Sequence, residues 1–449
     1  MTLAQIMMNG KRATALSCRE RIKGTFATRC VAAALCVAAG MSALADAKIP
    51  ILGWHGIPGK LVTAERYAEA RDMGMDILMQ AAPDIESARR FLDMAQDAGI
   101  KLCISLDDVR NQAKCVDAVC SLKDHPALAM YNIVDEPQTH TFAKWGGIVR
   151  LVNEADPAHE AYVNIVGDLG LGYSNRYYGA AADYKDFLDK FVSRVPVKTI
   201  SFDVYPLKSK AELPTGTSLR NGIGGVEVDE AWYNSLETVL ARRKELGQDF
   251  AGFALCNAHR NGKKPYMEPQ IPHMMLQQNV NLAYGAKMLQ FFVYWPVCNY
   301  HTERYEWQAQ TFTESEPYLR TTIYDRVREV VRRIQARAFV FAGGDVVKVR
   351  HTGEVPRGAT RLVPGDLPVW VRSLETPDGG AVVSQIVNGN AEYVVVVNRS
   401  PDTELTLRIG LADGVRRVRA DGSIASAALY SSEYWLEPGA MEVFGRKTR

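Results

Sequence analysis

Two neighbouring carboxylates end a short apolar run in YNIVDEPQ, residues 131–138. Ionised Asp135 and Glu136 repel each other, and dry surroundings beside Asp135 would raise the pKa of Glu136. A carboxyl group that keeps its proton near neutral pH can serve as a general acid. Pro137 then stops the strand and fixes the turn. The structural alternative for the same residues is that Asp135 caps the next helix and Glu136 lies at the surface.

Other side chains that can do chemistry also sit at the ends of apolar runs. Asp203, in TISFDVYP, is the best second carboxylate. Sugar sites combine a pair of carboxyl groups, which cleaves the glycosidic bond, with aromatic faces and with amides that bind hydroxyl groups. The pattern predicts a carbohydrate substrate. Three roles are open for Asp203: it takes part in the reaction, it binds a sugar hydroxyl group, or it is buried beside an Arg or Tyr. The expected substrate-binding residues are Trp54, His55, Asp135, Asn164, Tyr205, His259 and Trp295.

These residues lie at the ends of eight apolar runs that alternate with segments of helical period. Eight strands followed by helices predict a (β/α)8 TIM barrel over residues 46–337, in which the carboxyl ends of all strands meet at one rim. An open doubly wound sheet is disfavoured because GWHGIPGK, after the first run, has no Gly-rich phosphate turn. We expect no cofactor and no metal. The runs are 51–56, 75–80, 100–106, 127–134, 161–167, 199–206, 250–257 and 288–295.

The last part of the chain has a different texture. Residues 338–449 contain short alternating runs broken by Asp-Gly, Asn-Gly and Pro, as in TPDGGAVVSQIVNGNAEYVVVVNRSPD. We therefore predict a C-terminal antiparallel β-sandwich. Such a domain can pack against the barrel or bind carbohydrate, and packing is the commoner role.

The first 45 residues have the pattern of a secretory signal peptide. A basic leader precedes the apolar stretch VAAALCVAAGMSAL, and Ala43-Leu44-Ala45 fits a cleavage site. The stretch is shorter than the roughly 20 residues of a membrane span, so we expect cleavage after Ala45 and a secreted or periplasmic protein. A retained membrane anchor is the alternative. No later stretch resembles a membrane helix.

Composition excludes several classes of protein. The chain has 53 basic and 51 acidic residues, and loss of the leader would leave 47 and 50. Such a balance gives no reason to expect a nucleic-acid partner. Eight cysteines in 449 residues do not form a disulfide scaffold, and none is spaced as a zinc ligand set.

Several short motifs follow one another along the chain: Gly53-Trp54, His125 to Pro137, Asp156 to His159, Tyr162 to Asn164, Ser201 to Pro206, Phe250 to Leu255 and Ala283 to Trp295. Their order resembles that in secreted (β/α)8 glycoside hydrolases of the retaining clan that includes the β-galactosidases, and most closely that in an uncharacterised, galactosidase-like bacterial group. The resemblance implies that Glu136 is the acid/base and that Trp295 is the sugar platform of the eighth strand. That clan has a nucleophilic Glu at the end of the seventh strand, but FAGFALCNAHR has no carboxylate, and Cys256 occupies the position.

The missing nucleophile leaves the mechanism open. A separation of about 6.5–9.5 Å between Glu136 and Asp203 would indicate inversion, and about 5.5 Å would indicate retention. Asp135-Glu136 also resembles the acid pair of hexosaminidases that use the acetamido group of their substrate, although neighbouring side chains on a strand face opposite ways. A catalytically silent carbohydrate-binding barrel is a further alternative. A metal-dependent hydrolase built on Asp107, Asp108, His55 and His259 is the weakest.

Overall fold

The computed structural model describes residues 47–168, 174–220, 225–297, 307–427 and 432–448. The predicted leader, residues 1–45, lies outside these ranges. Residues 48–449 form one compact unit. Within the described residues, no helix is both long and apolar enough to cross a membrane.

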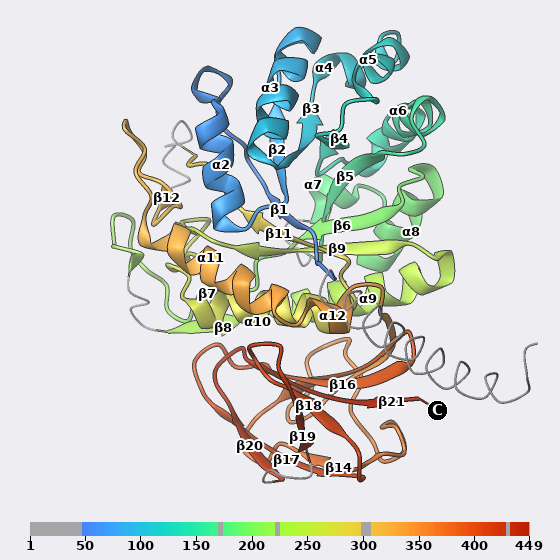
Figure 1. The fold of residues 1–449 in the computed structure, drawn as a ribbon, viewed down its shortest axis with the longest axis vertical. Coiled ribbons are helices and arrows are strands. Elements are labelled where there is room, and N and C mark those ends of the chain that lie inside the picture. The colour runs from blue at the N-terminus through green and yellow to red at the C-terminus, as the bar shows by residue number, and fades with distance from the viewer. Residues whose placement is uncertain (1–46, 169–173, 221–224, 298–306, 428–431, 449) are drawn as a thin grey trace, which may run out of the picture. The chain divides into compact units, whose positions relative to one another are not determined.

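Eight parallel strands form a closed barrel (Figure 1). Their order around the barrel is β1-β11-β9-β6-β5-β4-β3-β2, and β1 also pairs with β2 to close it. Each strand falls within or overlaps one of the eight predicted apolar runs, so the predicted fold class is confirmed. The strands are β1 (Ile51–Gly53), β2 (Ile77–Ala81), β3 (Lys101–Ser105), β4 (Leu128–Asp135), β5 (Glu160–Val166), β6 (Thr199–Asp203), β9 (Asp249–Leu255) and β11 (Met288–Phe292).

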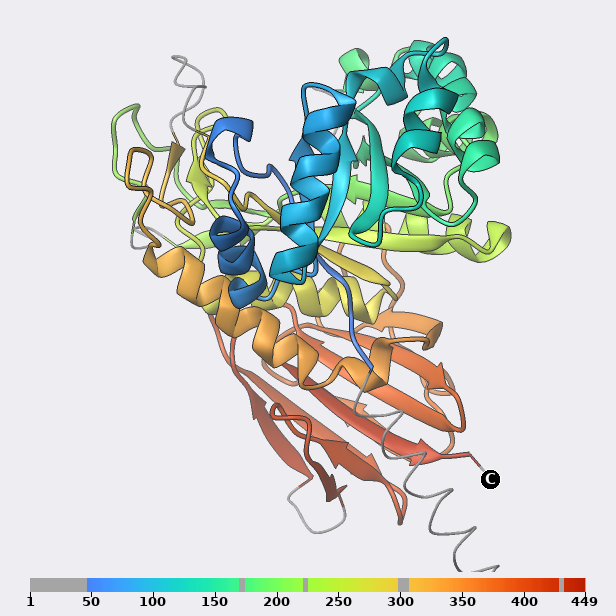
Figure 2. The same ribbon diagram turned by 45° about the horizontal axis from the view of Figure 1, so that its top comes forward.

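Helices cover the outside of the barrel (Figure 2). Several of them begin at a residue whose side chain caps the helix. Asp84 accepts a hydrogen bond from the Ser87 backbone at the start of α3, and Gly99 ends that helix in the left-handed conformation, as its sequence predicts. The helices are α2 (Ala64–Met73), α3 (Ile85–Ala98), α4 (Asp107–Arg110), α5 (Cys115–Leu122), α6 (Phe142–Ala155), α7 (Ser174–Tyr178), α8 (Tyr184–Arg194), α9 (Ala231–Leu246), α10 (Ile271–Ala283), α11 (Thr322–Gln335) and α12 (Ala338–Phe341).

Short elements decorate the connections between these strands and helices. Two are single 3-10 turns, and the others form two small antiparallel pairs, β7 with β8 and β10 with β12. They are η1 (Gly59–Leu61), η2 (Thr139–Thr141), β7 (Leu207–Ser209), β8 (Val226–Val228), β10 (Ala258–His259) and β12 (Trp307–Gln308).

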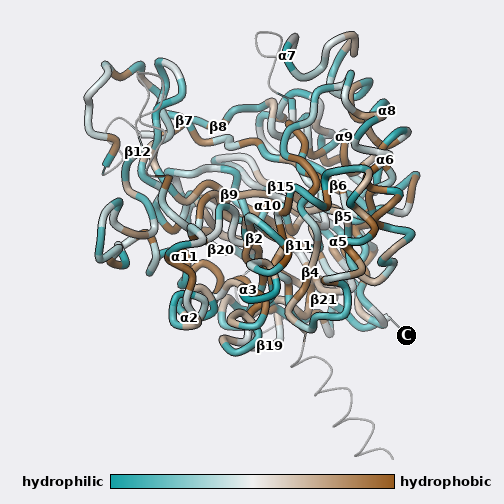
Figure 3. Tube along the Cα trace, turned by 90° about the horizontal axis from the view of Figure 1, so that it is seen from above, coloured by the Kyte–Doolittle hydropathy of each residue, from teal (hydrophilic) through white to brown (hydrophobic). Residues whose placement is uncertain are grey.

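The apolar residues form one core between strands and helices and a second inside the barrel. Figure 3 shows hydrophobic residues along central strands such as β5, β6 and β11, with hydrophilic loops at the periphery. The inner core joins Leu52, Cys103, Tyr162, Phe253 and Met288 from five strands. A packed interior of this kind fixes the strand ends, where the polar residues of the rim lie.

The C-terminal part is a sandwich of two antiparallel sheets, as predicted. The six-stranded sheet has the order β13-β15-β16-β21-β18-β19 and the three-stranded sheet β14-β17-β20. Both faces of β16 are buried because one face packs on α10 and the other on the small sheet, which explains its unbroken valine run. The strands are β13 (Asp345–His351), β14 (Val371–Glu375), β15 (Ala381–Asn388), β16 (Ala391–Asn398), β17 (Leu405–Leu411), β18 (Arg416–Val418), β19 (Ile424–Ser426), β20 (Glu433–Leu436) and β21 (Met441–Lys447).

Candidate active site at the carboxyl ends of the barrel strands

Three neighbouring strands bring the predicted acids and the predicted amide together. Asp135 at the end of β4 pairs in register with Asn164 on β5, and Asn164 pairs with Ser201 on β6, two residues before Asp203. The Asn164 amide nitrogen donates to an Asp135 carboxyl oxygen at 3.1 Å and to an Asp203 carboxyl oxygen at 2.9 Å. Because both oxygens contact one nitrogen atom, they are no more than about 6 Å apart.

A chain of buried polar groups beneath Asn164 sets the direction of its amide. The Ser201 hydroxyl donates to the Asn164 carbonyl oxygen at 3.0 Å, and the Gln290 side-chain nitrogen donates to the Ser201 hydroxyl at 2.9 Å. The Tyr162 hydroxyl donates to the carbonyl oxygen of Gln290. All four side chains are buried. Each acceptor oxygen in this chain of groups already receives a hydrogen bond from the side chain beneath it. The NH2 group of Asn164 is therefore held toward the two carboxyl groups.

The backbone of Glu136 departs from the geometry of a strand. Its φ is 44°, in the left-handed region that few residues other than glycine adopt, while its N–H donates to the Asn164 carbonyl at 2.9 Å. A regular strand would send Asp135 and Glu136 to opposite faces. Here the charges of both raise the pKa of Asp203. The turn at Glu136 therefore lets two adjacent carboxyl groups act on the same side chain.

Helix α7 supplies two residues that the sequence analysis missed. The Tyr177 hydroxyl donates a hydrogen bond to the Glu136 carboxyl group, and the positive charge of Arg176 also favours the ionised form. Thr139, just after the acid pair, donates to the Tyr178 backbone carbonyl at 2.7 Å and ties α7 to this turn. The only signal in the sequence was the tyrosine pair itself, which has no spacing that marks it as part of a site.

The three carboxyl groups do not all ionise near neutral pH. Burial, then the charges of Glu136 and Asp135, raise the pKa of Asp203 well above its ordinary value. Burial and the charge of Glu136 raise the pKa of Asp135 to about 7, although solvent reaches this side chain. Burial also raises the pKa of Glu136, and the Tyr177 hydrogen bond opposes the shift. The cluster therefore holds at least one proton at neutral pH, as acid–base chemistry requires.

Aromatic side chains lie close to this cluster. Burial is the largest cause that raises the pKa of Tyr205, and the charges of all three acids raise it further, so its hydroxyl is near them. The ring centre of Tyr205 lies 5.3 Å from that of Phe292. Trp54 is largely buried, and its ring centre lies 5.9 Å from the ring centre of Tyr162. His55 is exposed, and its Nδ1 donates to the Trp295 carbonyl at 3.1 Å. Of these predicted contacts, Tyr205 has the clearest link to the acids.

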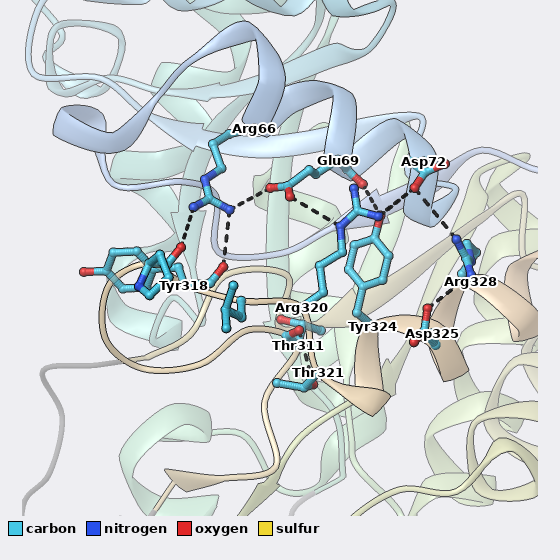
Figure 4. Close-up of polar contacts among 12 residues, drawn as sticks. Arg66, Glu69, Asp72, Thr311, Tyr318, Arg320, Thr321, Tyr324, Asp325 and Arg328 are labelled. Atoms are coloured by element: carbon cyan, nitrogen blue, oxygen red, sulfur yellow. Dashed lines mark hydrogen bonds and ion pairs between the residues drawn. The ribbon is translucent and has the colours of Figure 1, made fainter.

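Trp295 lies in the hydrophobic core, with 1% of its surface exposed. The rings of Phe312 and Tyr318 pack on it at 5.1 and 5.2 Å, and the Arg66 guanidinium lies 5.5 Å from its ring centre. Arg66 also donates to the carbonyls of Pro317 and Tyr318, within an ion-pair network that ties α2 to residues 311–328 (Figure 4). Because this segment covers the indole, we do not assign Trp295 to the proposed sugar contacts.

His259 is also a packed residue. It is 5% exposed, stacks on Trp307 with ring centres 4.5 Å apart, and shares a hydrogen bond of 2.8 Å with the Asn257 side chain. Burial lowers the pKa of His259 to about 3, so the ring is neutral. Asp107 and Asp108 pair instead with Arg110 and Lys114. Among the described residues, no three His, Cys, Asp or Glu side chains gather as a metal-ligand set.

These features define the class of molecule: a (β/α)8 barrel with a carboxyl cluster at the ends of β4 and β6. Several solved structures with a similar fold are glycoside hydrolases. A β-galactosidase from Bacillus circulans sp. alkalophilus has a TM-score of 0.55 at 9% identity, over 89% of this chain and 99% of its own. A catalytic mutant of a family 42 β-galactosidase from G. stearothermophilus has a TM-score of 0.57 at 8% identity, over 89% and 98%.

A third similar structure widens the range of relatives. A family 39 glycoside hydrolase from Bacteroides cellulosilyticus WH2 has a TM-score of 0.50 at 8% identity, over 89% of this chain and 81% of its own. No protein-family model and no curated protein matches the chain. At such low identity the similarity establishes the fold, and the chemistry depends on the residues of this chain.

Proposed function

We propose that this protein is a glycoside hydrolase that cleaves an oligo- or polysaccharide, with Glu136 as general acid/base and Asp203 as the second carboxyl group. The observation that carries the proposal is the cluster itself, in which Asn164 bridges Asp135 and Asp203 while both neighbouring acids act on Asp203. Most glycoside hydrolases use one carboxylic acid and one carboxylate on either side of the scissile bond. The fold shared with β-galactosidases supports the same class of substrate.

In the first step, Glu136 gives its proton to the glycosidic oxygen as the bond to the anomeric carbon breaks. In one route the Asp203 carboxylate bonds to that carbon, and a water molecule that gives a proton to Glu136 then displaces Asp203. In the other route Asp203 takes a proton from the water that attacks the carbon directly. In either case the leaving group departs as an alcohol, and one water molecule is consumed per bond. Tyr177 donates to Glu136 and would stabilise its carboxylate after the proton has left.

The opposite division of roles also has an observation in its favour. Asp203 has two acidic neighbours that hold its proton on, whereas Tyr177 and Arg176 favour ionised Glu136. Asp203 would then be the acid and Glu136 the base. The two assignments differ in which variant becomes more impaired as the leaving group becomes a weaker acid, because only the general acid assists departure.

A second candidate is a hexosaminidase that uses the acetamido group of its own substrate. The left-handed turn at Glu136 favours it, because Asp135 and Glu136 then act on one side of the strand end together. Asp135 would orient the acetamido group and Glu136 would protonate the leaving oxygen. This candidate predicts turnover of 2-acetamido-2-deoxy glycosides and none of the matching glycosides with a 2-hydroxyl group.

Substrate binding is assigned to Asn164 and Asp135 in the cluster, to Tyr205 beside it, and to Trp54 and the exposed His55, which follow β1. Carbohydrate chains are abundant outside cells, which agrees with the expected signal peptide. We therefore also propose that the protein acts in the periplasm or as a secreted enzyme.

The test is turnover of aryl glycosides that differ in sugar and in leaving group. Glu136→Gln and Asp203→Asn are expected to lower kcat/KM by at least about 1,000-fold on the active sugar, since each removes a reacting group. Glu154→Gln, an exposed glutamate on α6, is the matched control and should behave as the wild type. Binding of oligosaccharides without turnover of any glycoside would instead identify a catalytically silent binding barrel.

A further inference from the structure

A cavity of about 460 Å³ lies away from the acid cluster, between the barrel helices and the C-terminal sandwich. Residues at the start of α10 and the end of α11 form one wall. The strands β20 and β21, with the turn between them, form the other wall. This volume is within the range of roughly 300–1,000 Å³ that small-molecule sites occupy.

Two glycines fix the edges of this cavity by close backbone contact. Gly439 has a φ of 65°, and a Cβ atom there would lie 2.4 Å from the Pro272 carbonyl oxygen. Gly422 has a φ of 82°, and a Cβ atom there would lie 2.1 Å from the Ala336 carbonyl oxygen. The Asn279 side chain also donates to the Gly439 carbonyl at 2.8 Å. The cavity is therefore bounded by direct contacts on two sides and is preformed.

Trp435 is the prominent feature of the lining. It is 67% exposed, while its neighbours in β20, Tyr434 and Leu436, point into the sandwich core. Tryptophan is highly buried on average, so an indole with most of its surface in solvent at the edge of a cavity is uncommon. Its face is available to stack on a flat apolar ligand surface.

Arg337 lies at the floor of the same cavity and is 3% exposed. One guanidinium nitrogen donates to the Met441 carbonyl at 2.9 Å, while its Nε has no hydrogen-bond partner among the described residues. A guanidinium group has five N–H donors, and buried donors normally have partners. The negative charge of Glu442 acts on Arg337, but two hydrogen bonds from Arg417 engage that carboxylate.

The charges of the lining balance. Three arginines and three acids contribute to it: Arg332, Arg333, Arg337, Asp421, Glu437 and Glu442. Arg332 and Arg333 both donate hydrogen bonds to the Glu329 carboxylate. A site for an anion would show an excess of unpaired cations. Donors and acceptors in equal measure beside a free aromatic face suit a ring that carries many hydroxyl groups and no charge.

We infer that this cavity is a second carbohydrate site, in which a neutral saccharide segment stacks on Trp435 and hydrogen-bonds to the arginines and acids around it. The choice of a saccharide rests on the proposed function as well as on the lining. Such a site would hold the polymer on the enzyme while the acid cluster acts on another part of the chain, which raises the effective concentration of substrate.

Affinity electrophoresis of the full chain tests the inference. The gels contain a soluble β-mannan, β-glucan, β-xylan or β-galactan, or polygalacturonic acid as the anionic arm, and every form carries Glu136→Gln so that no polymer is cleaved. At least one neutral polymer should retard the protein. Trp435→Ala should weaken that retardation about tenfold or more, as loss of a central aromatic contact does. Trp435→Phe should retain most of it. Val369→Ala, at an exposed position of the same domain, is the matched control.

The other outcomes overturn the inference. Retardation by no neutral polymer, retardation only by polygalacturonic acid, or retardation that Trp435→Ala leaves unchanged would each do so. Loss of retardation in Tyr205→Ala but not in Trp435→Ala would place the ligand at the barrel rim instead. Failure of the proposed function is a separate result, because absence of turnover in the wild type with Trp435-dependent retardation would leave this second site standing.

Discussion

Asn164 offers the sharpest test of the carboxyl cluster, because one amide contacts two acids. Its hydrogen bonds lower the pKa of both Asp135 and Asp203. A hydrogen bond to a charged group contributes about 1.5–3 kcal/mol, and one pH unit corresponds to about 1.36 kcal/mol. Asn164→Ala should therefore raise the pKa of each acid by about 1–2 units, as long as the fold is retained.

Repulsion between ionised Asp135 and ionised Asp203 also raises the pKa values of these two acids. Two unit charges about 6 Å apart repel by about 3 kcal/mol at an effective dielectric constant of 20. The amide dipole of Asn164, which lies between the two oxygens, offsets part of this repulsion. Without it, ionisation of the second carboxyl group becomes harder. The acidic limb of the kcat/KM profile, which reports the essential carboxylate of the free enzyme, should then move upward.

The assay is kcat/KM for the best aryl glycoside between about pH 4 and 9. We expect the acidic limb of Asn164→Ala to lie about 1–2 units above that of the wild type, with a loss of 10–100-fold near pH 5 that shrinks at higher pH. Ser201→Ala should give a smaller shift of the same sign, because it frees the amide to rotate. Asn153→Ala, whose amide bonds to a backbone carbonyl on the barrel surface, is the control.

A folded Asn164→Ala protein with an unchanged pH profile would refute this reasoning. Circular dichroism and the melting temperature establish folding, since Asn164 is buried and its loss removes the hydrogen bond that Ser201 donates to it. A uniform loss at all pH values would show that Asn164 positions the substrate and does not tune the acids.

Three further predictions concern other contacts of the site. Tyr177→Phe removes the donor to Glu136 and should lower kcat/KM about 10–100-fold while raising the pKa of Glu136, seen in the pH profile. The folded-state pKa of Asp135 is raised, so its contribution to stability is present at low pH and is lost as the pH rises through about 7. Asp135→Asn should therefore melt about 2 °C above the wild type at pH 8, and the difference should vanish toward pH 4. Arg66→Ala should reduce the free energy of unfolding in urea by about 1–2 kcal/mol and shift the tryptophan emission to the red, because Trp295 loses part of its cover.

The sequence was most informative about what the barrel itself positions. Parallel strands buried on both faces read as continuous apolar runs, so all eight could be located. Their carboxyl ends must meet at one rim, which is enough to predict that Asp135, Asn164 and Asp203 come together. The hydrogen bonds of Asn164 agree with that prediction. None of this required knowledge of a side-chain rotamer.

The remaining features depend on contacts between distant segments. Nothing in Asp-Glu-Pro indicates that Glu136 adopts a positive φ, because that conformation is imposed by its neighbours. Tyr177 belongs to α7, which two hydrogen bonds from Thr139 tie to the turn after the acid pair. The segment that packs over Trp295 contains Tyr318 and is held by Arg66. These two residues are 252 positions apart in the sequence. Such long-range packing is not encoded in any local pattern.

Cys256 bears on the proposal that the reacting groups come from β4 and β6. It follows β9, where the related hydrolases named by the sequence resemblance place a nucleophilic Glu, but its side chain is fully buried and its thiol donates to the Val293 carbonyl at 3.4 Å. Burial raises the pKa of Cys256 far above its ordinary value, so almost no thiolate forms.

A thiol in this state can be neither a nucleophile nor a base. Cys256→Ala should therefore retain kcat/KM within about twofold, and its cost should appear in stability, about 1–2 kcal/mol for the atoms removed from the core. Iodoacetamide should leave the activity of the native protein intact, because only a thiolate reacts readily. Rapid inactivation by iodoacetamide, blocked by a competitive inhibitor and absent in Cys256→Ala, would instead make Cys256 the nucleophile. Asp203 would then be left as a ligand of the sugar.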